Sequence, residues 1–337
     1  MRLETGESKM LIREKVVVIL PAYNEELTIA DTIRSFHDAL PDVPIYVVDN
    51  NSSDRTGELA NGMFAELNCK GRVLVEPRQG KGNALRRAFM DVDADIFLLS
   101  DADSTYPADR AMDMVRPIQE GRADMVVGDR LSQGHYQREN KRPLHSFGNQ
   151  LVQSLVNRLF NSRLVDIMSG YRAFSREFVK NYPILVEGFQ VETDMTLHAL
   201  HARFRILELP VEYKDRPAGS FSKLNTFADG MRVLTTIAQI LRYYRPLLFW
   251  GGLAVLAFIG GLLAGLPVLK DWLTYKYIYH VPMAILATGL EIVAVVMIAV
   301  GLILDSMVHF HKLEYERVLL QGRANSEKET VGIDVPS

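Results

Sequence analysis

The first part of the chain alternates short apolar runs with stretches of helical period. Four short, mostly apolar runs are each followed by a polar loop and then by a helix-like segment; they span residues 16–20, 45–48, 72–75 and 96–99, and the third begins with Arg72. Continuous apolar runs of this length are typical of strands that are covered on both faces. Four strand–helix units in series predict an α/β fold with a mainly parallel sheet and right-handed crossovers. The strands then end at one edge, where residues far apart in sequence converge on a cleft.

The run at 96–99 ends in two carboxylates, Asp101 and Asp103, and Pro107 prevents the strand from continuing. In open α/β sheets ligands bind at this end of the strands. Two hard oxygen ligands there suit Mg²⁺ or Mn²⁺ with a phosphorylated substrate. The alternative is a loop in which the two residues only form a turn and cap a helix.

The ends of the second and third runs carry related chemistry. Asp49 is suited to accept hydrogen bonds from a nucleobase or ribose, Gly80 and Gly82 permit close backbone approach, and Lys81 can face a phosphate. The alternative is that these loops only cap helices and form turns. The first run is followed by Pro21-Ala-Tyr-Asn-Glu25 instead of a G-x-G-x-x-G turn, which excludes a Rossmann dinucleotide site.

The middle of the chain adds another strand and a helix. A run at 123–127 leads into Arg130, which is predicted either to stabilise a diphosphate leaving group or to form a surface ion pair. Apolar residues recur at helical spacing between Leu144 and Phe160. This helix is expected to pack on the sheet or to lie on a membrane surface, because basic residues cluster around it.

Two long apolar stretches follow at residues 247–269 and 281–304, and the second contains one acid, Glu291. Both are long enough to cross a hydrocarbon core of about 30 Å; a buried helix hairpin is the alternative. The segment at 227–244 ends in the mixture of aromatic and basic residues that is typical of a membrane interface. Glu291 is expected to face its partner helix or another copy of the chain, in a homo-oligomer formed through the transmembrane helices.

Charge refines this organisation. The 337-residue chain has a net charge of −3, which does not favour a nucleic-acid partner, and its single cysteine, Cys69, excludes a disulfide framework and a cysteine metal cluster. Basic residues are more numerous on the outer flanks of the two spans than in the loop that connects them. Both termini and the catalytic domain are therefore predicted to lie on the cytoplasmic side of the inner membrane. The predicted divisions are a tail at 1–14, a catalytic domain at 15–218, an interfacial segment at 219–246, the spans within 247–304, and a tail at 305–337 that is disordered after Gln321.

Four motifs together resemble family 2 glycosyltransferases with a GT-A fold. They are Pro21-Ala-Tyr-Asn-Glu25, Asp49-Asn-Asn-Ser-Ser-Asp54, Gly80-Lys-Gly-Asn-Ala84 and Asp101-Ala-Asp103. Later segments at 166–175, 188–194 and 216–224 resemble the polyprenyl-phosphate branch, which includes dolichyl-phosphate mannose synthases and bacterial undecaprenyl-phosphate glucosyltransferases. The resemblance covers residues 15–245. The chain departs from it at Asn50-Asn51 and at Thr105, which leaves the donor sugar open.

The resemblance implies roles for the matching positions. The donor nucleotide is expected to contact Pro21, Ala22, Tyr23, Glu25, Asp49, Asn51, Asp54, Gly80, Lys81, Gly82, Asp101 and Ala102. The metal ligands are expected to be Asp101 and Asp103. The predicted catalytic residues are Asp166, first among them, with Asp103, Arg130, Glu192 and Asp194. The acceptor phosphate is assigned to Arg172, Arg216, Ser220, Ser222 and Lys223, whose cationic and hydroxyl groups suit a phosphate.

The expected reaction follows from the acceptor. A phosphate monoester has a second pKa of about 6, so polyprenyl phosphate is already a nucleophile and needs no strong base. We therefore expect an inverting, metal-dependent transfer of a hexose from a donor of the UDP-glucose or GDP-mannose type, as in cell envelope glycosylation. One alternative is a processive polysaccharide synthase, but the chain has only Trp250 and Trp272 and lacks that group's Gln-x-x-Arg-Trp motif. The other is a non-catalytic nucleotide-sugar binder or lipid-flipping accessory protein, which the intact carboxylate pair argues against.

Overall fold

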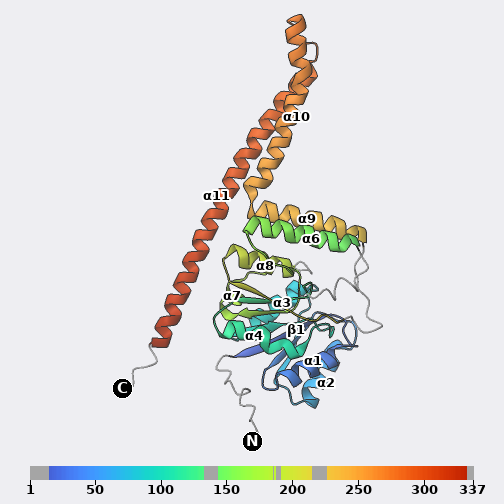
Figure 1. Ribbon diagram of the computed structural model, residues 1–337, viewed down its shortest axis with the longest axis vertical. Coiled ribbons are helices and arrows are strands. Elements are labelled where there is room, and N and C mark those ends of the chain that lie inside the picture. Colours follow the sequence, from blue (N-terminus) through green and yellow to red (C-terminus); the bar gives the residue numbers. More distant parts are fainter. Residues whose placement is uncertain (1–14, 133–142, 185, 187–190, 215–225, 332–337) are drawn as a thin grey trace. The chain divides into compact units, whose positions relative to one another are not determined.

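The structure is a computed structural model that describes residues 15–132, 143–184, 186, 191–214 and 226–331 (Figure 1). It divides into two compact units, Met1–Thr226 and Phe227–Ser337. Each unit has its own architecture: the first is an α/β domain and the second consists of helices.

A seven-stranded sheet organises the first unit. The strands are β1 (Val16–Ala22), β2 (Ile45–Asp49), β3 (Gly71–Val75), β4 (Ile96–Leu99), β5 (Met125–Asp129), β6 (Arg172–Ser175) and β7 (Ile206–Pro210), in the spatial order β3-β2-β1-β4-β6-β5-β7. The first four are parallel, which confirms the prediction from the apolar runs. Strand β6 runs antiparallel to both β4 and β5. Its N-terminal end, preceded by residues 166–171, therefore lies at the edge where β4 and β5 end.

Helices cover both faces of this sheet. On one face lie α1 (Ile29–Ala39), α2 (Thr56–Glu66) and α4 (Ala111–Gln119), with a short 3-10 turn η1 (Ala108–Arg110). On the other lie α3 (Lys81–Asp91), α7 (Arg176–Asn181) and α8 (Val191–His201), and α6 (Pro143–Phe160) contacts α8. Side chains of β4 alternate between two cores: Leu98 packs with Phe36 of α1 on one face, and Phe97 packs with Phe178 of α7 on the other. Burial on both faces explains why the sequence of β4 is continuously apolar.

Helix α6 was predicted from its apolar spacing, and the structure confirms the helix. Val152 and Val156 are buried, whereas Leu151 is 41% exposed. Gln153 and Asn157 on the same helix donate to the carbonyl of Leu164. These two amides hold the turn around residue 164 against the helix.

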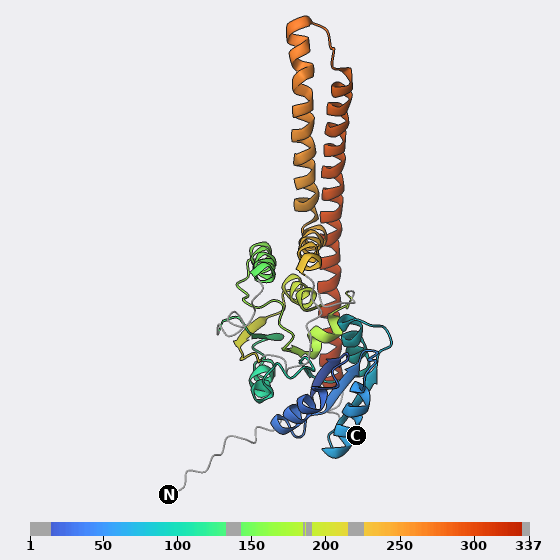
Figure 2. The ribbon, with the colours of Figure 1, turned by 90° about the vertical axis from the view of Figure 1, so that its right-hand side faces the viewer.

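The second unit contains α9 (Thr226–Tyr244), α10 (Pro246–Tyr275) and α11 (Val281–Val331). Helices α10 and α11 pack along each other (Figure 2), and both contain stretches long and apolar enough to cross a membrane. Glu291 faces the partner helix as predicted, since a Cβ at Gly261 would lie 2.6 Å from its Oε1. Helix α11 continues to Val331, so the disorder predicted after Gln321 is wrong up to that residue. The Arg, Ala, Glu and Lys residues there are good helix formers.

Candidate functional site

The loops that follow β1 and β2 are tied together at the edge of the sheet. The backbone N–H of Glu25 donates to Oγ1 of Thr56 at 2.8 Å, and that of Ser53 donates to Oδ1 of Asn24 at 2.8 Å. Asp54 accepts from the backbone N–H of Thr56 at 3.0 Å, but the N-cap residue of α2 is Arg55, which makes no side-chain capping hydrogen bond. The helix therefore begins without the side-chain cap of the alternative interpretation, and the ties bring the predicted residues of the first two strand ends side by side.

The loop after β3 is held by the side chain of Asn50, a residue noted above only as a departure from the family motif. Asn50 is 4% exposed; its amide donates to the carbonyl of Arg78 at 2.6 Å and accepts from the N–H of Gly80 at 2.7 Å. Glu76 is also buried and accepts from Nε of Arg78 at 2.7 Å, and this hydrogen bond lowers the pKa of Glu76 to about 2. Gly80 has a φ of 126°, which only glycine adopts without strain. The loop is therefore held in one conformation where a donor diphosphate is predicted.

The predicted donor-binding residues differ in their solvent exposure. Tyr23 and Asn51 are exposed, and the hydroxyl of Tyr23 accepts from the amide of Gln79 at 3.2 Å. The side chains of Ala22 and Ala102 are 2% exposed. Their carbonyls accept hydrogen bonds within the protein, from the N–H of Asn50 and the hydroxyl of Thr28.

Lys81 is engaged with carboxylates. Its Nζ contacts Oδ1 of Asp101 and lies 2.5 Å from Oε1 of Glu192, which comes from the first turn of α8. Burial lowers the pKa of Lys81, but the two carboxylates outweigh burial and raise it well above its usual value. The structure therefore brings Glu192 to the Asp101 site, and it places the Lys81 ammonium at that carboxylate.

The second predicted metal ligand is more deeply placed. Asp103 is 2% exposed, and its Oδ1 accepts from Oγ1 of Thr105 at 2.6 Å. Within the described residues, no group of three or more His, Cys, Asp or Glu is arranged to hold a metal ion. Mg²⁺ is commonly held by one or two carboxylates together with substrate phosphates. The two carboxylates at the end of β4 are donors of the type that such a cation takes, and one oxygen of Asp101 contacts the Lys81 ammonium.

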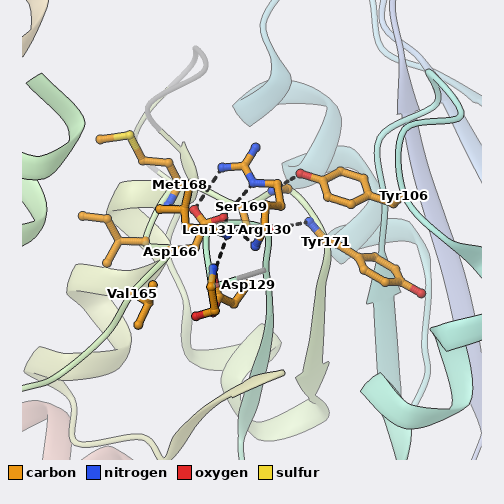
Figure 3. A network of polar contacts seen from close by, with 12 residues as sticks. Tyr106, Asp129, Arg130, Leu131, Val165, Asp166, Met168, Ser169 and Tyr171 are labelled. Atoms are coloured by element: carbon orange, nitrogen blue, oxygen red, sulfur yellow. Dashed lines mark hydrogen bonds and ion pairs between the residues drawn. The ribbon is translucent and has the colours of Figure 1, made fainter. Parts of the chain in front are cut away.

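Asp166 and Arg130 form a two-point ion pair (Figure 3). Nε of Arg130 lies 2.7 Å from Oδ2 of Asp166, and Nη2 lies 2.9 Å from Oδ1. The carboxylate of Glu208 on β7 accepts from the backbone N–H groups of Val165 and Asp166 at 2.8 Å. Burial raises the pKa of Glu208 above its usual value. The guanidinium also lies over the ring of Tyr213, 5.5 Å from its centroid.

Tyr106 and Gly170 connect this pair to the Asp101 carboxylate. The hydroxyl of Tyr106 accepts from the N–H of Gly170 at 2.9 Å, and its ring contacts Tyr213 at a centroid distance of 5.4 Å. A Cβ on Gly170 would lie 2.6 Å from Oδ2 of Asp101. The arginine–aspartate pair and the strand-end carboxylates thus belong to one site.

Two predicted residues are engaged by other groups of the protein. The guanidinium of Arg172 is 0% exposed and donates to the carbonyls of Ser169 and Ile167 at 2.8 Å, so the structure does not place it where a lipid phosphate can contact it. Burial raises the pKa of Asp194, which accepts from the hydroxyl of Tyr182 at 2.7 Å. The predicted acceptor residues Arg216, Ser220, Ser222 and Lys223 lie outside the described residues.

The sequence analysis missed Glu208, Tyr106 and Gly170. Tyr106 and Gly170 stand inside motifs that were singled out, next to residues that were chosen. Glu208 lies in an apolar strand, and a lone acid in such a strand could have been recognised as a candidate for a buried polar contact. A charged side chain in such a strand needs partners, and here the partners are backbone N–H groups.

Comparison with known proteins agrees with this geometry. A family model described as glycosyl transferase family 2 matches residues 17–182. The chain is 29% identical over 311 residues to glycosyltransferase AglJ of Haloferax volcanii, covering 90% of this chain and 97% of that protein. It is 28% identical to a dolichyl-phosphate hexose transferase of the same organism, covering 67% of this chain and 94% of that protein. It is also 28% identical to a dolichol-phosphate mannosyltransferase of Pyrococcus furiosus, covering 71% of this chain and 65% of that protein.

Among solved structures, glucosyl-3-phosphoglycerate synthase from Mycobacterium tuberculosis has the same fold. It is 22% identical and superposes with a TM-score of 0.52, over 68% of this chain and 78% of that one. The mixed, mostly parallel sheet is therefore of the GT-A type. The chain belongs to glycosyl transferase family 2 and is a glycosyltransferase related to dolichyl-phosphate hexose and mannose transferases.

Proposed function

We propose that this enzyme transfers a hexose from a nucleotide sugar to polyprenyl phosphate at a membrane surface. The observation that carries the proposal is the single site in which the Arg130–Asp166 pair adjoins the carboxylates at the end of β4. The two long apolar helices and the similarity to dolichyl-phosphate hexose transferase support a lipid acceptor.

The proposed chemistry needs charge neutralisation more than proton transfer. The phosphate oxygen of the acceptor forms the new bond to the anomeric carbon, while the bond from that carbon to the donor diphosphate breaks. An in-line displacement of this kind inverts the anomeric configuration. Arg130, held in place by both oxygens of Asp166, supplies fixed positive charge for the departing diphosphate. In this proposal Asp166 orients Arg130 and is not a general base.

Asp101 and Asp103 would hold a divalent cation. When bound, Mg²⁺ or Mn²⁺ supplies further positive charge for the diphosphate. Lys81 and Glu192 then adjust the charge around Asp101, because the ammonium contacts both carboxylates. Thr105 fixes the orientation of Asp103 through its hydroxyl.

The proposed donor pocket is the edge formed by the loops after β1, β2 and β3, with Tyr23, Asp49 and Asn51 facing the nucleotide. The proposed acceptor site comprises Arg216, Ser220, Ser222 and Lys223. We leave Arg172 out of it, since its guanidinium is fully buried and bonded to backbone carbonyls. Arg172 instead holds the loop that carries Asp166.

The test is an assay of the purified full-length enzyme with a panel of UDP- and GDP-sugars and polyprenyl phosphate, followed by extraction of the lipid product. We expect one donor to give an organic-soluble product with inverted anomeric configuration, a requirement for divalent cation, and about a 10²-fold or greater loss of turnover in Asp101→Asn. Transfer to a growing polysaccharide, or no transfer to lipid phosphate with any donor, would overturn the proposal.

A further inference from the structure

The connection between α10 and α11 is built around a buried carboxylate. Asp271 is 5% exposed, and its Oδ2 accepts from the backbone N–H groups of Tyr279 at 2.8 Å and His280 at 3.0 Å. The same oxygen lies 2.8 Å from Nδ1 of His280. Three contacts on one oxygen fold the connection back onto the last turns of α10, so the loop has a defined shape.

Beside this loop lies a groove of about 900 Å³. Its apolar part is formed by Leu263, Leu266 and Pro267, which recur at helical spacing on one face of α10. Its polar part lies about one turn further along the same face, at Lys270, and continues into the loop. The groove is therefore amphipathic along its length, with a hydrocarbon-lined end and a charged end.

The polar end can recognise an anion that carries hydroxyl groups. Lys270 has no ion-pair partner within the described part of the chain, and its side chain is exposed. Because Nδ1 of His280 is committed to Asp271, the other ring nitrogen is the one left for a ligand. Tyr275 and Tyr279 add phenolic hydroxyls to the groove wall and pack edge to face, with ring centroids 5.5 Å apart.

The surrounding loop has the composition of a membrane interface. Trp272, Tyr275, Tyr277 and Tyr279 are more than half exposed, as expected where aromatic rings lie among lipid headgroups. Lys276 lies over Trp272, 5.8 Å from the ring centroid. With α10 in a bilayer, this composition would set the charged end of the groove among the headgroups and its apolar end along the hydrocarbon.

We propose that this groove binds one anionic phospholipid of the phosphatidylglycerol type. Its phosphate lies against Lys270, its headgroup hydroxyls contact His280 and the tyrosines, and one acyl chain lies along Leu263, Leu266 and Pro267. The site is independent of the transferase reaction and needs only that α10 and α11 lie in a bilayer. It gives the loop end of the helical pair a specific lipid ligand.

The test uses Trp272 as a reporter. The chain has two tryptophans, and Trp250→Phe removes the other one; Nε1 of Trp250 has no hydrogen-bond partner in the described structure, so this change loses no bond. The full-length variant is placed in nanodiscs of neutral lipid with small amounts of brominated phosphatidylglycerol or brominated phosphatidylcholine. Quenching of Trp272 emission then reports which lipid occupies the groove.

We expect brominated phosphatidylglycerol to be preferred roughly tenfold. Lys270→Gln should reduce the preference to near unity, and His280→Gln, the second variant, should weaken it. Lys276→Gln is the matched control, because it removes the same charge from the residue that follows α10, and Lys276 does not line the groove. It should retain most of the preference.

Three results would overturn the proposal. One is no preference in the parent protein. Another is an equal loss in Lys270→Gln and Lys276→Gln, which indicates general interfacial attraction in place of a site. The third is displacement of the brominated lipid by an equal amount of polyprenyl phosphate, which would assign the groove to an isoprenoid phosphate. Soluble glycerol phosphate should not displace the brominated lipid, because it has no acyl chain to fill the apolar end of the groove.

Discussion

Arg130 and Asp166 are 36 residues apart in sequence and meet through two parallel contacts of 2.7 and 2.9 Å. The Asp166 side chain is 2% exposed and that of Arg130 is 13% exposed. The pair therefore holds a desolvated positive charge in a fixed orientation beside the end of β4. A guanidinium is suited to this role because its planar fork matches a carboxylate on one side and phosphate oxygens on another.

Breaking this pair should cost both activity and stability. We expect Asp166→Asn to lower kcat by about 10²-fold or more, because Arg130 loses its orientation, and to lower stability by about 3 kcal/mol. Arg130→Lys should not restore activity, since lysine cannot make two parallel contacts. Turnover and thermal unfolding in detergent measure the two effects. In the double variant Asp166→Asn/Arg130→Gln the losses should be clearly less than additive; additive losses would show that the residues act separately.

Gly170 should tolerate no side chain if Asp101 must keep its position. A Cβ there would lie 2.6 Å from Oδ2 of Asp101, so Gly170→Ala is expected to rotate that carboxylate and reduce turnover at least tenfold while the protein still folds. The matched control is Gly62→Ala on α2, where a Cβ meets nothing within 4 Å. That change should leave turnover unaffected and slightly raise the unfolding temperature. Full activity in Gly170→Ala would contradict the proposed role of Asp101.

The Glu76–Arg78 pair should make stability depend on pH in the acid range. The pKa of Glu76 is lowered to about 2, so its ionised form stabilises the folded state above the ordinary glutamate pKa of about 4.3, and this contribution is lost as the pH falls toward 2. Glu76→Gln should therefore be less stable than the parent at pH 7. The difference in unfolding temperature should shrink steadily below about pH 4.3. A constant difference across this range would mean that the carboxylate charge is not responsible.

The basic residues around the apolar helices predict the topology. Cys69 is the single cysteine, so Cys69→Ser provides a background for Thr274→Cys and Ser326→Cys. A membrane-impermeant maleimide should label position 274 in intact cells and position 326 only after the membrane is opened. The reverse pattern would place the catalytic unit outside and overturn the cytoplasmic assignment.

Arg216 is the sharpest test of the proposed acceptor site. Arg216→Ala should raise the apparent KM for lipid phosphate, or lower kcat with it, while donor binding measured without lipid changes little. Arg216→Lys should recover only part of the loss, because a lysine cannot grip two phosphate oxygens. Loss of donor binding with an unchanged lipid dependence would move Arg216 to the diphosphate side.

Local sequence was sufficient for the parallel half of the sheet. Strands β1 and β4 are continuously apolar because both of their faces are buried, and each of the four strands β1 to β4 is followed by polar residues at the same edge. The motifs at those ends also identified the family, because residues that contact a shared ligand follow the strands directly. The two apolar helices could likewise be predicted from length and composition alone.

What the sequence could not supply were contacts that depend on β6. Its four residues, Arg172–Ser175, carry no strand signal of their own, and their antiparallel place between β4 and β5 is decided by the sheet as a whole. That placement carries Asp166 to Arg130 and Gly170 to Asp101. It also buries Arg172, which in sequence looks like any other motif arginine. Ion pairing and burial depend on which segments meet in space, so only the tertiary structure decided which charged groups are partners and which remain for a substrate.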